Sequence, residues 1–481
     1  MAEPATPELA PHYYRDNFFS LCDTVRERYD DLLLGEEREL LARLHSLPFA
    51  AQCLYVRLVS RSGPWFREAR LDYPEIGAIN KALDALLDAG LAAEPAGLST
   101  EELGRLFTRG ELSELFGAEL ASQAFVDKQA QLAAIEALSL PDDGLLERLY
   151  RADGARIVTP EGVDLLATLQ LLFFGNRRQS LTEFVLSDLG VVRYFDYDLD
   201  REYRQFASRA ALDEYLACAA LHDLHWELVE LGMTASLPAL ATEVLALEPQ
   251  HESSEGRFAR LCNALARDLE RAGELELALS LYRRSPRHPA RERQARILER
   301  QEHWEDARAL SDDILAAPWC EEEQEAAQRI LPRVRRKLGD KPAPQPRDSF
   351  ERIDLVLPEP DGRVERASAA ALAADWAEVH YVENALMNTL FGLAFWEEIF
   401  APVAGAFQHP YQGAPADMYS GRFLARRRGM IERRLDTLRN ADLAELLRAA
   451  YARYHPYQNL SLIHISEPTR PPVASRMPSS A

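Results

Sequence analysis

The chain has 481 residues, 47% of them apolar, so it is long enough for several domains with sizeable cores and too apolar to be globally disordered. Its formal net charge of −22 argues by itself against a nucleic-acid partner, because phosphate contacts need local positive charge, although an acidic whole can carry a basic face. No run of about 18 uncharged apolar residues occurs and the start of the chain lacks the pattern of a signal peptide, so we expect a cytoplasmic protein without a membrane span.

Cysteine and lysine usage adds two constraints. The five cysteines are scattered and have no metal-binding spacing, which is typical of packed thiols in a reducing compartment. Only four lysines occur, so arginine carries almost all of the positive charge. Arginine suits bidentate phosphate contacts, but a GC-rich genome is the simpler explanation of this bias.

Residues 12–95 have the pattern of a winged-helix DNA-binding region. Apolar residues recur at helical spacing over 14–45, and a second helix follows. Gly63 marks a turn, residues 65–71 are expected to form a short strand, and a further helix is predicted from about Glu75. A ribbon between helices is the order that a winged helix requires.

Residues 96–144 read as a small helical region that resembles the SAP type of DNA-binding hairpin. Ser99 followed by Glu102 forms the pattern of a capping box, in which each side chain satisfies a backbone N–H of the other's residue. Two short apolar-faced helices are expected behind it.

Residues 145–340 read as paired helices. Leu-Glu-Arg at 269–271 recurs at 298–300, and Ala278 is answered by Ala307. A repeat of this kind predicts stacked helical hairpins, and the array resembles tetratricopeptide repeats, although the spacing is irregular. A proline-rich linker at 341–349 then leads to a new domain.

The new domain, residues 350–459, opens with an alternating apolar pattern at 353–357 that predicts a strand. A helix is expected over 382–396. On this helix Glu383 falls on the same stripe as Met387 and Ala394, where a carboxylate is costly unless it is paired or binds a metal ion. The alternative is that Glu383 caps the helix start, where anions are favoured.

Several motifs in this domain and near the N-terminus resemble the VRR-NUC nucleases of the Fanconi-associated nuclease family. The matching segments are 382–386, 390–393, 396–397, 399–403, 405–410 and 415–419, together with 13–18, 63–67 and 73–77. They extend over about 12–459 and follow the family's domain order. The chain is therefore identified as a member of this family.

The resemblance implies a mainly α fold: a winged-helix/SAP-like region, a tetratricopeptide-like helical-repeat middle, and the front of an α/β restriction-endonuclease-like nuclease domain. It implies a metal-dependent, structure-specific DNA nuclease of phosphodiesterase I type, which cuts near 5′ flaps or exonucleolytically in the repair of interstrand crosslinks. The expected partner is branched or flapped double-stranded DNA at the bacterial nucleoid, and the expected cofactor is Mg²⁺ or Mn²⁺. Glu383 matches the family's first metal-binding glutamate and is the predicted catalytic residue.

The sequence departs from the family at the catalytic end. The family's core carries a Pro-Asp and a Glu-x-Lys further on, whereas none of the four lysines here has an acidic residue two positions earlier. Residues 460–470 read like a translated sequencing adapter, so 460–481 are expected to be an artefactual tail that does not belong to the fold. We therefore expect a truncated, inactive copy of a nuclease. The alternative is a non-catalytic adaptor or DNA-binding scaffold.

Three groups of arginines are candidate phosphate contacts. Residues 257–300 hold eleven arginines against six acidic residues, and the functional interpretation competes with a solvated face paired to glutamates. The same two interpretations apply beside the predicted ribbon and in the nuclease segment, where arginines either steer DNA or cover a helix. The predicted contacts are Arg61, Arg67, Arg70, Arg257, Arg260, Arg291, Arg296, Arg426 and Arg427, with Arg267, Arg271, Arg293, Arg422 and Arg428 in the same stretches.

Overall fold

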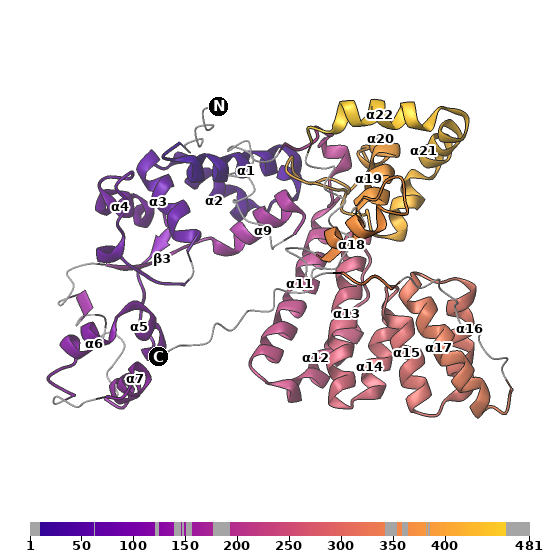
Figure 1. The fold of residues 1–481 in the computed structure, drawn as a ribbon. Coiled ribbons are helices and arrows are strands. Elements are labelled where there is room, and N and C mark those ends of the chain that lie inside the picture. The colour runs from indigo at the N-terminus through magenta and orange to yellow at the C-terminus, as the bar shows by residue number, and fades with distance from the viewer. Residues whose placement is uncertain are drawn as a thin grey trace. The chain divides into compact units, whose positions relative to one another are not determined.

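The computed structural model describes residues 10–61, 63–120, 125–138, 146, 149–150, 156–176, 193–341, 354–357, 364–380, 382 and 385–457. The contacts within the chain divide it into two compact units. Unit 1 comprises Met1–Gln205 and Asn384–Ala481, and unit 2 comprises Phe206–Glu383 (Figure 1).

The N-terminal body of unit 1 is a group of helices around the nearly fully buried helix α3. The helices are α1 (Tyr13–Tyr29), α2 (Gly35–Ser46), α3 (Phe49–Val59), α4 (Ile79–Asp88) and α9 (Val163–Phe174), with the 3-10 turns η1 (Asp30–Leu32) and η2 (Glu68–Arg70). Helix α3 packs on α1 and α4, and α1 packs on α9. Seven of the eleven residues of α3 are buried, which explains why its sequence is mostly apolar.

A three-stranded antiparallel sheet closes this body. The strands β1 (Phe66–Arg67), β2 (Ala92–Ala93) and β3 (Ile157–Pro160) lie in the order β1-β3-β2. Phe66 pairs with Val158, and Ala92 pairs with Pro160. The sequence assigned residues from 145 onward to the helical repeats. The structure instead places β3 and α9 in unit 1. Among the described strands, β3 is the one that pairs with both β1 and β2, so it belongs to their sheet.

The ribbon and the helix after it are shorter than the sequence predicts. The expected strand over 65–71 is reduced to β1, and η2 follows it directly. The helix expected from Glu75 begins at Ile79. Gly77 has a φ of +78°, a left-handed conformation that cannot continue a right-handed helix, so the turn around Pro74 is kept separate from α4.

The predicted capping box is confirmed in the next region. This region contains α5 (Thr100–Leu106), α6 (Arg109–Leu115) and α7 (Lys128–Glu136), which share an apolar core with Leu103, Leu112 and Phe116. Ser99 Oγ accepts a hydrogen bond from the backbone N–H of Glu102, and Glu102 accepts one from the backbone N–H of Ser99 at 2.8 Å. Thr108 and Glu111 form a second box of the same kind at α6.

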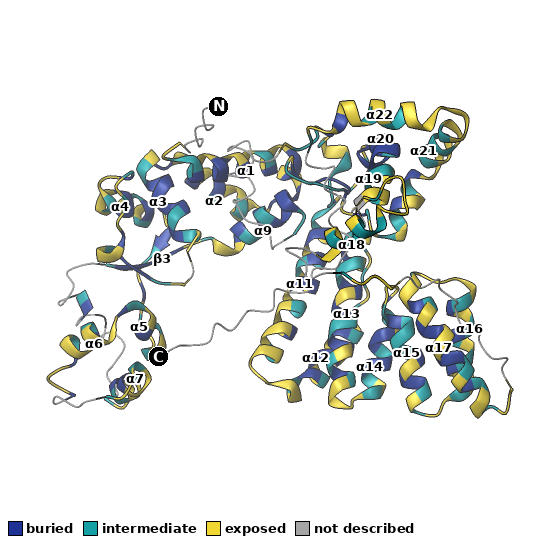
Figure 2. Ribbon diagram, viewed as in Figure 1, coloured by how far each residue is buried: buried dark blue, intermediate teal, exposed yellow. Residues whose placement is uncertain are grey.

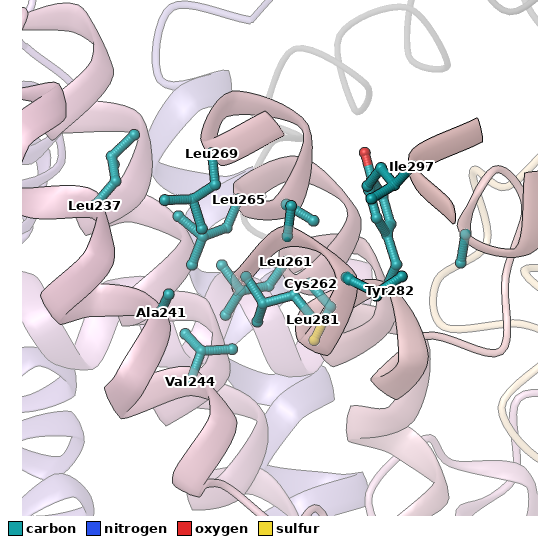
Figure 3. Close-up of a cluster of buried hydrophobic side chains, with 14 of the residues drawn as sticks. Leu237, Ala241, Val244, Leu261, Cys262, Leu265, Leu269, Leu281, Tyr282 and Ile297 are labelled. Carbon is teal, nitrogen blue, oxygen red and sulfur yellow. The ribbon is translucent and has the colours of Figure 1, made fainter. Parts of the chain in front are cut away.

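Unit 2 is a series of helices packed in chain order. They are α11 (Arg209–Glu230), η4 (Thr234–Ser236), α12 (Leu237–Ala246), α13 (Glu252–Ala272), α14 (Leu275–Arg284), α15 (Ala290–Arg300), α16 (Trp304–Ala316), α17 (Glu321–Lys337) and α18 (Val364–Leu372). Helices α11 to α17 pack on their neighbours in sequence and bury one continuous apolar core between them (Figures 2 and 3).

The predicted internal echo lies at matching positions in this array. Leu269 and Leu298 lie near the ends of α13 and α15, and Ala278 and Ala307 are fully buried in α14 and α16. The two copies are therefore successive helical hairpins, α13–α14 and α15–α16. Their small buried alanines allow adjacent helices to approach closely.

The nuclease segment, residues 385–457 of the expected nuclease domain in unit 1, consists of helices with a non-helical stretch at 400–420. It contains α19 (Ala385–Ala394), α20 (Trp396–Ile399), α21 (Gly421–Asn440) and α22 (Leu443–Tyr454), packed on an aromatic core in which the rings of Trp396 and Tyr454 stack at 4.5 Å. The predicted helix over 382–396 breaks at Phe395. Residues 354–357 are not a strand, because no described strand lies beside them to supply hydrogen bonds. The described helices include none that is both long and apolar enough to span a bilayer.

Candidate nucleic-acid interface and nuclease segment

Glu383, the predicted metal ligand, lies outside the described residues. The apolar stripe to which it was assigned is described from Met387 onward. Met387 is 72% exposed, Leu390 is half-buried, and Ala394 is buried. The stripe is thus covered only at its C-terminal end.

Glu397 in the nuclease segment is engaged with protein groups. Tyr454 donates its hydroxyl to Glu397, which also pairs with Arg453 at 3.1 Å. Across the part of the chain that the structure describes, no three His, Cys, Asp or Glu side chains come together as a metal site.

Glu398 is a buried carboxylate with weak compensation. Its side chain lies 4.0 Å from Nε of Arg434, which is at the limit of an ion pair. Burial is the main cause that raises the pKa of Glu398, and the positive charge of Arg434 opposes the shift. The neutral form is therefore favoured here relative to an exposed glutamate.

Arg427 does not fit the predicted contact with DNA. Its side chain on α21 is fully buried and donates from Nη1 to Oδ2 of Asp417 at 2.8 Å. Arg426 is partly exposed and donates to the carbonyl of Ala404 at 2.8 Å. Arg428 on the same helix is exposed. Arg426 and Arg428 therefore remain accessible to a phosphate, whereas Arg427 does not.

The arginines beside β1 divide in the same way. Arg67 is 5% exposed and donates to Oε1 of Glu111 at 2.8 Å, so a direct phosphate contact does not fit. Arg70 pairs with the same oxygen at 2.7 Å but is 63% exposed. Arg61 is exposed and donates to the hydroxyl of Tyr73 at 2.9 Å. Hydrogen bonds from the backbone and hydroxyl of Thr108 and from both arginines hold the pKa of Glu111 well below its usual range.

Helix α13 carries the clearest basic surface of unit 2. At 100° per residue, Arg260, Arg267 and Arg271 fall on one face, opposite the buried Leu265 and Leu269. All three arginines are exposed, and they extend over roughly 16 Å of helix axis. Arg271 pairs with Asp268 in an exposed pair, which restrains its charge only weakly. Arg257 lies off this row, half-buried against the ring of Tyr215 at 5.2 Å.

The arginines predicted on α15 mostly hold the repeats together. Arg291 pairs with Glu323, a fully buried carboxylate on α17, and its guanidinium lies 3.9 Å from the ring centroid of Trp319. Arg293 pairs with Glu270 on α13. Arg296 is 45% exposed and pairs with Glu292 one turn away at 2.7 Å. Of the two predicted contacts on this helix, Arg291 is structural and Arg296 remains accessible.

The docking of the nuclease segment onto the N-terminal body of unit 1 was not predicted. Arg28 on α1 is buried and donates to the carbonyl of Gln408. The hydroxyl of Tyr197 donates to the carbonyl of His409 at 2.7 Å. Burial and the charge of Arg28 lower the pKa of His409 to about 3, so its ring is neutral at physiological pH. Local sequence patterns contain no signal for pairs so far apart in the chain.

The fold and this surface define a class of protein. It is a modular helical protein whose N-terminal body combines helices with a short ribbon, as many DNA-binding domains do, and whose helical array carries a row of arginines. The family model described as the FAN1 HTH domain matches residues 12–93, which run from the start of α1 to the end of β2.

Full-length comparisons specify the family. A Fanconi-associated nuclease 1 homolog of Pseudomonas aeruginosa is 38% identical over 456 residues, which cover 93% of this chain and 79% of that protein. A homolog of Arabidopsis thaliana is 24% identical over 91% of this chain and 55% of its own length. The crystal structure of paFAN1 bound to 5′ flap DNA with a 2-nucleotide flap and a gap matches with a TM-score of 0.80 and 36% identity, over 95% of this chain and 82% of that one. The chain belongs to the Fanconi-associated nuclease family.

Proposed function

We propose that this chain binds branched or flapped double-stranded DNA and has the architecture of a structure-specific nuclease of phosphodiesterase I type, an activity that the family resemblance links to 5′ flaps in the repair of interstrand crosslinks at the nucleoid. The observation that carries the proposal is the match over nearly the whole chain to a solved relative bound to 5′ flap DNA. A second structure of paFAN1, with a 1-nucleotide flap, matches with a TM-score of 0.75 and supports the same substrate.

The arginine row of α13 supports DNA binding by a protein that is acidic overall. Arg260, Arg267 and Arg271 place positive charge on a face that carries none of the helix's core residues. Phosphate contacts are local, so a row of this kind can bind a backbone although the net charge is −22. Arg61 and Arg70 near β1, Arg296 on α15, and Arg426 are further proposed contacts.

We further propose Mg²⁺ or Mn²⁺ as the cofactor, with Glu383 as a ligand. This rests on the match of 382–386 to the family's motif. When bound, the ion would lower the pKa of a water molecule and neutralise charge on the phosphate. Because the sequence contains no Glu-x-Lys, we propose that this polypeptide itself cuts little and acts as a DNA-binding scaffold.

The test separates binding from cutting. Fluorescence anisotropy should show tighter binding of a 5′-flap duplex than of a 3′-flap or blunt duplex of the same length. Equal affinity for all three would contradict the proposed substrate. In parallel, the flap duplex is incubated with Mn²⁺ and the products are resolved on a gel.

Little or no cleavage is the expected result. Robust cleavage that Glu383→Ala abolishes, and that the exposed control Glu432→Ala retains, would overturn the proposed inactivity and establish Glu383 as catalytic. Manganese electron paramagnetic resonance measures metal binding independently of activity. Equal Mn²⁺ affinity in the wild type and in Glu383→Gln would remove Glu383 from the metal site.

A further inference from the structure

The C-terminal half of α11 exposes an apolar surface that nothing in unit 2 covers among the described residues. Trp226 is 66% exposed, and Leu224 and Val229 are also exposed. Leu231 and Met233 are exposed in the turn that follows the helix. By helical spacing, Leu224 and Leu231 fall about 140° to 160° from Trp226 and so lie on another face. Exposed turns of α11 are yellow in Figure 2. Isolated exposed apolar residues are ordinary, but a 66%-exposed tryptophan beside the exposed Val229 on one helix face forms a patch that calls for an explanation.

This patch continues a buried stripe of the same helix. Ala219, His222, Trp226 and Val229 follow one another at helical spacing on one face. Ala219 is fully buried, His222 is half-buried, and Trp226 and Val229 are exposed. The residues that attach this half of α11 to the repeat core lie on another face, among them Leu221 and Leu228. The helix therefore has a second apolar face that loses its cover after His222.

The chain segment that carries the patch is acidic. Residues 210–256 contain nine aspartates and glutamates and no lysine or arginine. Asp223, Glu227 and Glu230 lie side by side along one edge of the exposed stripe, at 80° to 140° by helical spacing if His222 is set at 0°. An acidic border of this kind repels nucleic acid phosphates and anionic membrane surfaces.

We propose that the exposed stripe of α11, formed by Trp226, Val229 and Met233 and bordered by Asp223, Glu227 and Glu230, is a docking surface for a basic amphipathic helix of another protein. Apolar side chains of the partner, such as leucine, would cover Trp226 and Val229, and its lysines or arginines would form ion pairs with the acidic residues along the edge. Tryptophan is among the side chains that dominate binding energy when a partner covers it.

A second copy of this chain is a poorer occupant. A symmetric pair uses the same patch on both copies, which would bring two acidic borders together. Charge complementarity favours a partner of the opposite sign, with a faster association that salt slows. The proposal goes beyond DNA cleavage and does not depend on it.

The probe is a fluorescein-labelled peptide of about 18 residues, with leucine at helical spacing and lysine elsewhere. Anisotropy titrations use the full chain, a scrambled peptide of the same composition, and a leucine/glutamate peptide with the same pattern. We expect the leucine/lysine peptide to bind and the other two to bind at least about tenfold more weakly. Trp226→Ala should weaken binding about tenfold, which is about 1.4 kcal/mol. Glu227→Lys with Glu230→Lys should weaken it further.

Trp376→Ala is the matched control, because Trp376 is 61% exposed in the same unit and lies outside the patch. Circular dichroism confirms that each variant is folded. The proposal is overturned if no peptide binds, if the scrambled peptide binds as well, or if Trp226→Ala and Trp376→Ala behave alike. It is equally overturned if sedimentation shows dimers that Trp226→Ala dissolves, or if Trp226→Ala weakens binding of 5′-flap DNA.

Discussion

Helices α13 and α21 are similar in length and rich in arginine, yet they use arginine in different ways. On α13 the row of Arg260, Arg267 and Arg271 lies opposite the apolar face and is exposed throughout. On α21, Arg427 is fully buried against Asp417, and Arg434 donates to the carbonyl of Ala394. The lesson is that the number of arginines does not identify a DNA-binding surface. The position of the nearest carboxylate or carbonyl determines whether a guanidinium is available.

The largest effect on stability is expected when the buried ion pair on α21 is removed. Arg427→Met leaves the carboxylate of Asp417 buried without its partner, which should destabilise the fold by about 3–5 kcal/mol. Urea unfolding measures the loss. Arg428→Met, at an exposed position on the same helix, should change stability by less than about 0.5 kcal/mol.

The double variant Asp417→Leu with Arg427→Met tests the cause. It should recover most of the stability, because an apolar pair of similar volume carries no desolvation penalty. If Arg427→Met is as stable as Arg428→Met, the ion pair does not stabilise the fold, and Arg427 is again a candidate DNA contact.

Arg291 on α15 lies in the same basic stretch as the α13 row, but like Arg427 it pairs with a buried carboxylate. Arg291→Ala leaves Glu323 buried without its guanidinium partner, so we expect a loss of about 3 kcal/mol. Arg296→Ala breaks an exposed pair within α15 and should cost less than about 1 kcal/mol. Differential scanning calorimetry compares the two. Equal melting temperatures would show that burial of Glu323 is not energetically important.

Charge reversal on the α13 row tests the other side of the comparison. Arg260→Glu with Arg267→Glu should weaken binding of flap DNA about tenfold near 0.1 M salt and lower the slope of log affinity against log salt by about 2. Arg308→Glu with Arg329→Glu makes the same change in net charge at exposed, already paired positions of unit 2 and should have little effect. If both double variants weaken binding equally, net charge explains the affinity and the row does not.

The smallest expected effect concerns Glu398, which lies near Arg434 of α21. Burial raises the pKa of Glu398 in the folded state, so the protonated form is stabilised by folding. The favourable contribution is complete below the unfolded pKa and is lost as pH rises through the folded pKa. Glu398→Gln should therefore raise the melting temperature slightly near pH 7 and leave it unchanged near pH 4. A decrease near pH 7 would mean that the ion pair with Arg434 outweighs the cost of burial.

Local patterns were sufficient wherever a feature depends on residues near one another in the chain. The capping box at Ser99 and Glu102 follows from a four-residue pattern and is confirmed. The echo between 269–271 and 298–300 predicts successive hairpins because helical spacing alone specifies which face is apolar. The matching segments from 12 to 459 were sufficient for the family, which the full-length comparisons show.

Tertiary structure decided what depends on distant residues. Strand β3 pairs with β2 although it lies more than sixty residues later in the chain. Local patterns do not show a pairing over this separation, so β3 was predicted to belong to the repeats. Arg67, Arg291 and Arg427 form ion pairs with acidic residues that the fold brings beside them. The sequence around an arginine does not show which distant carboxylate it will pair with. By itself the sequence determined the family, the capping box at Ser99 and the succession of hairpins α13–α14 and α15–α16. Folding determined which arginines are neutralised and which face solvent, because ion pairing and burial are properties of neighbours in space.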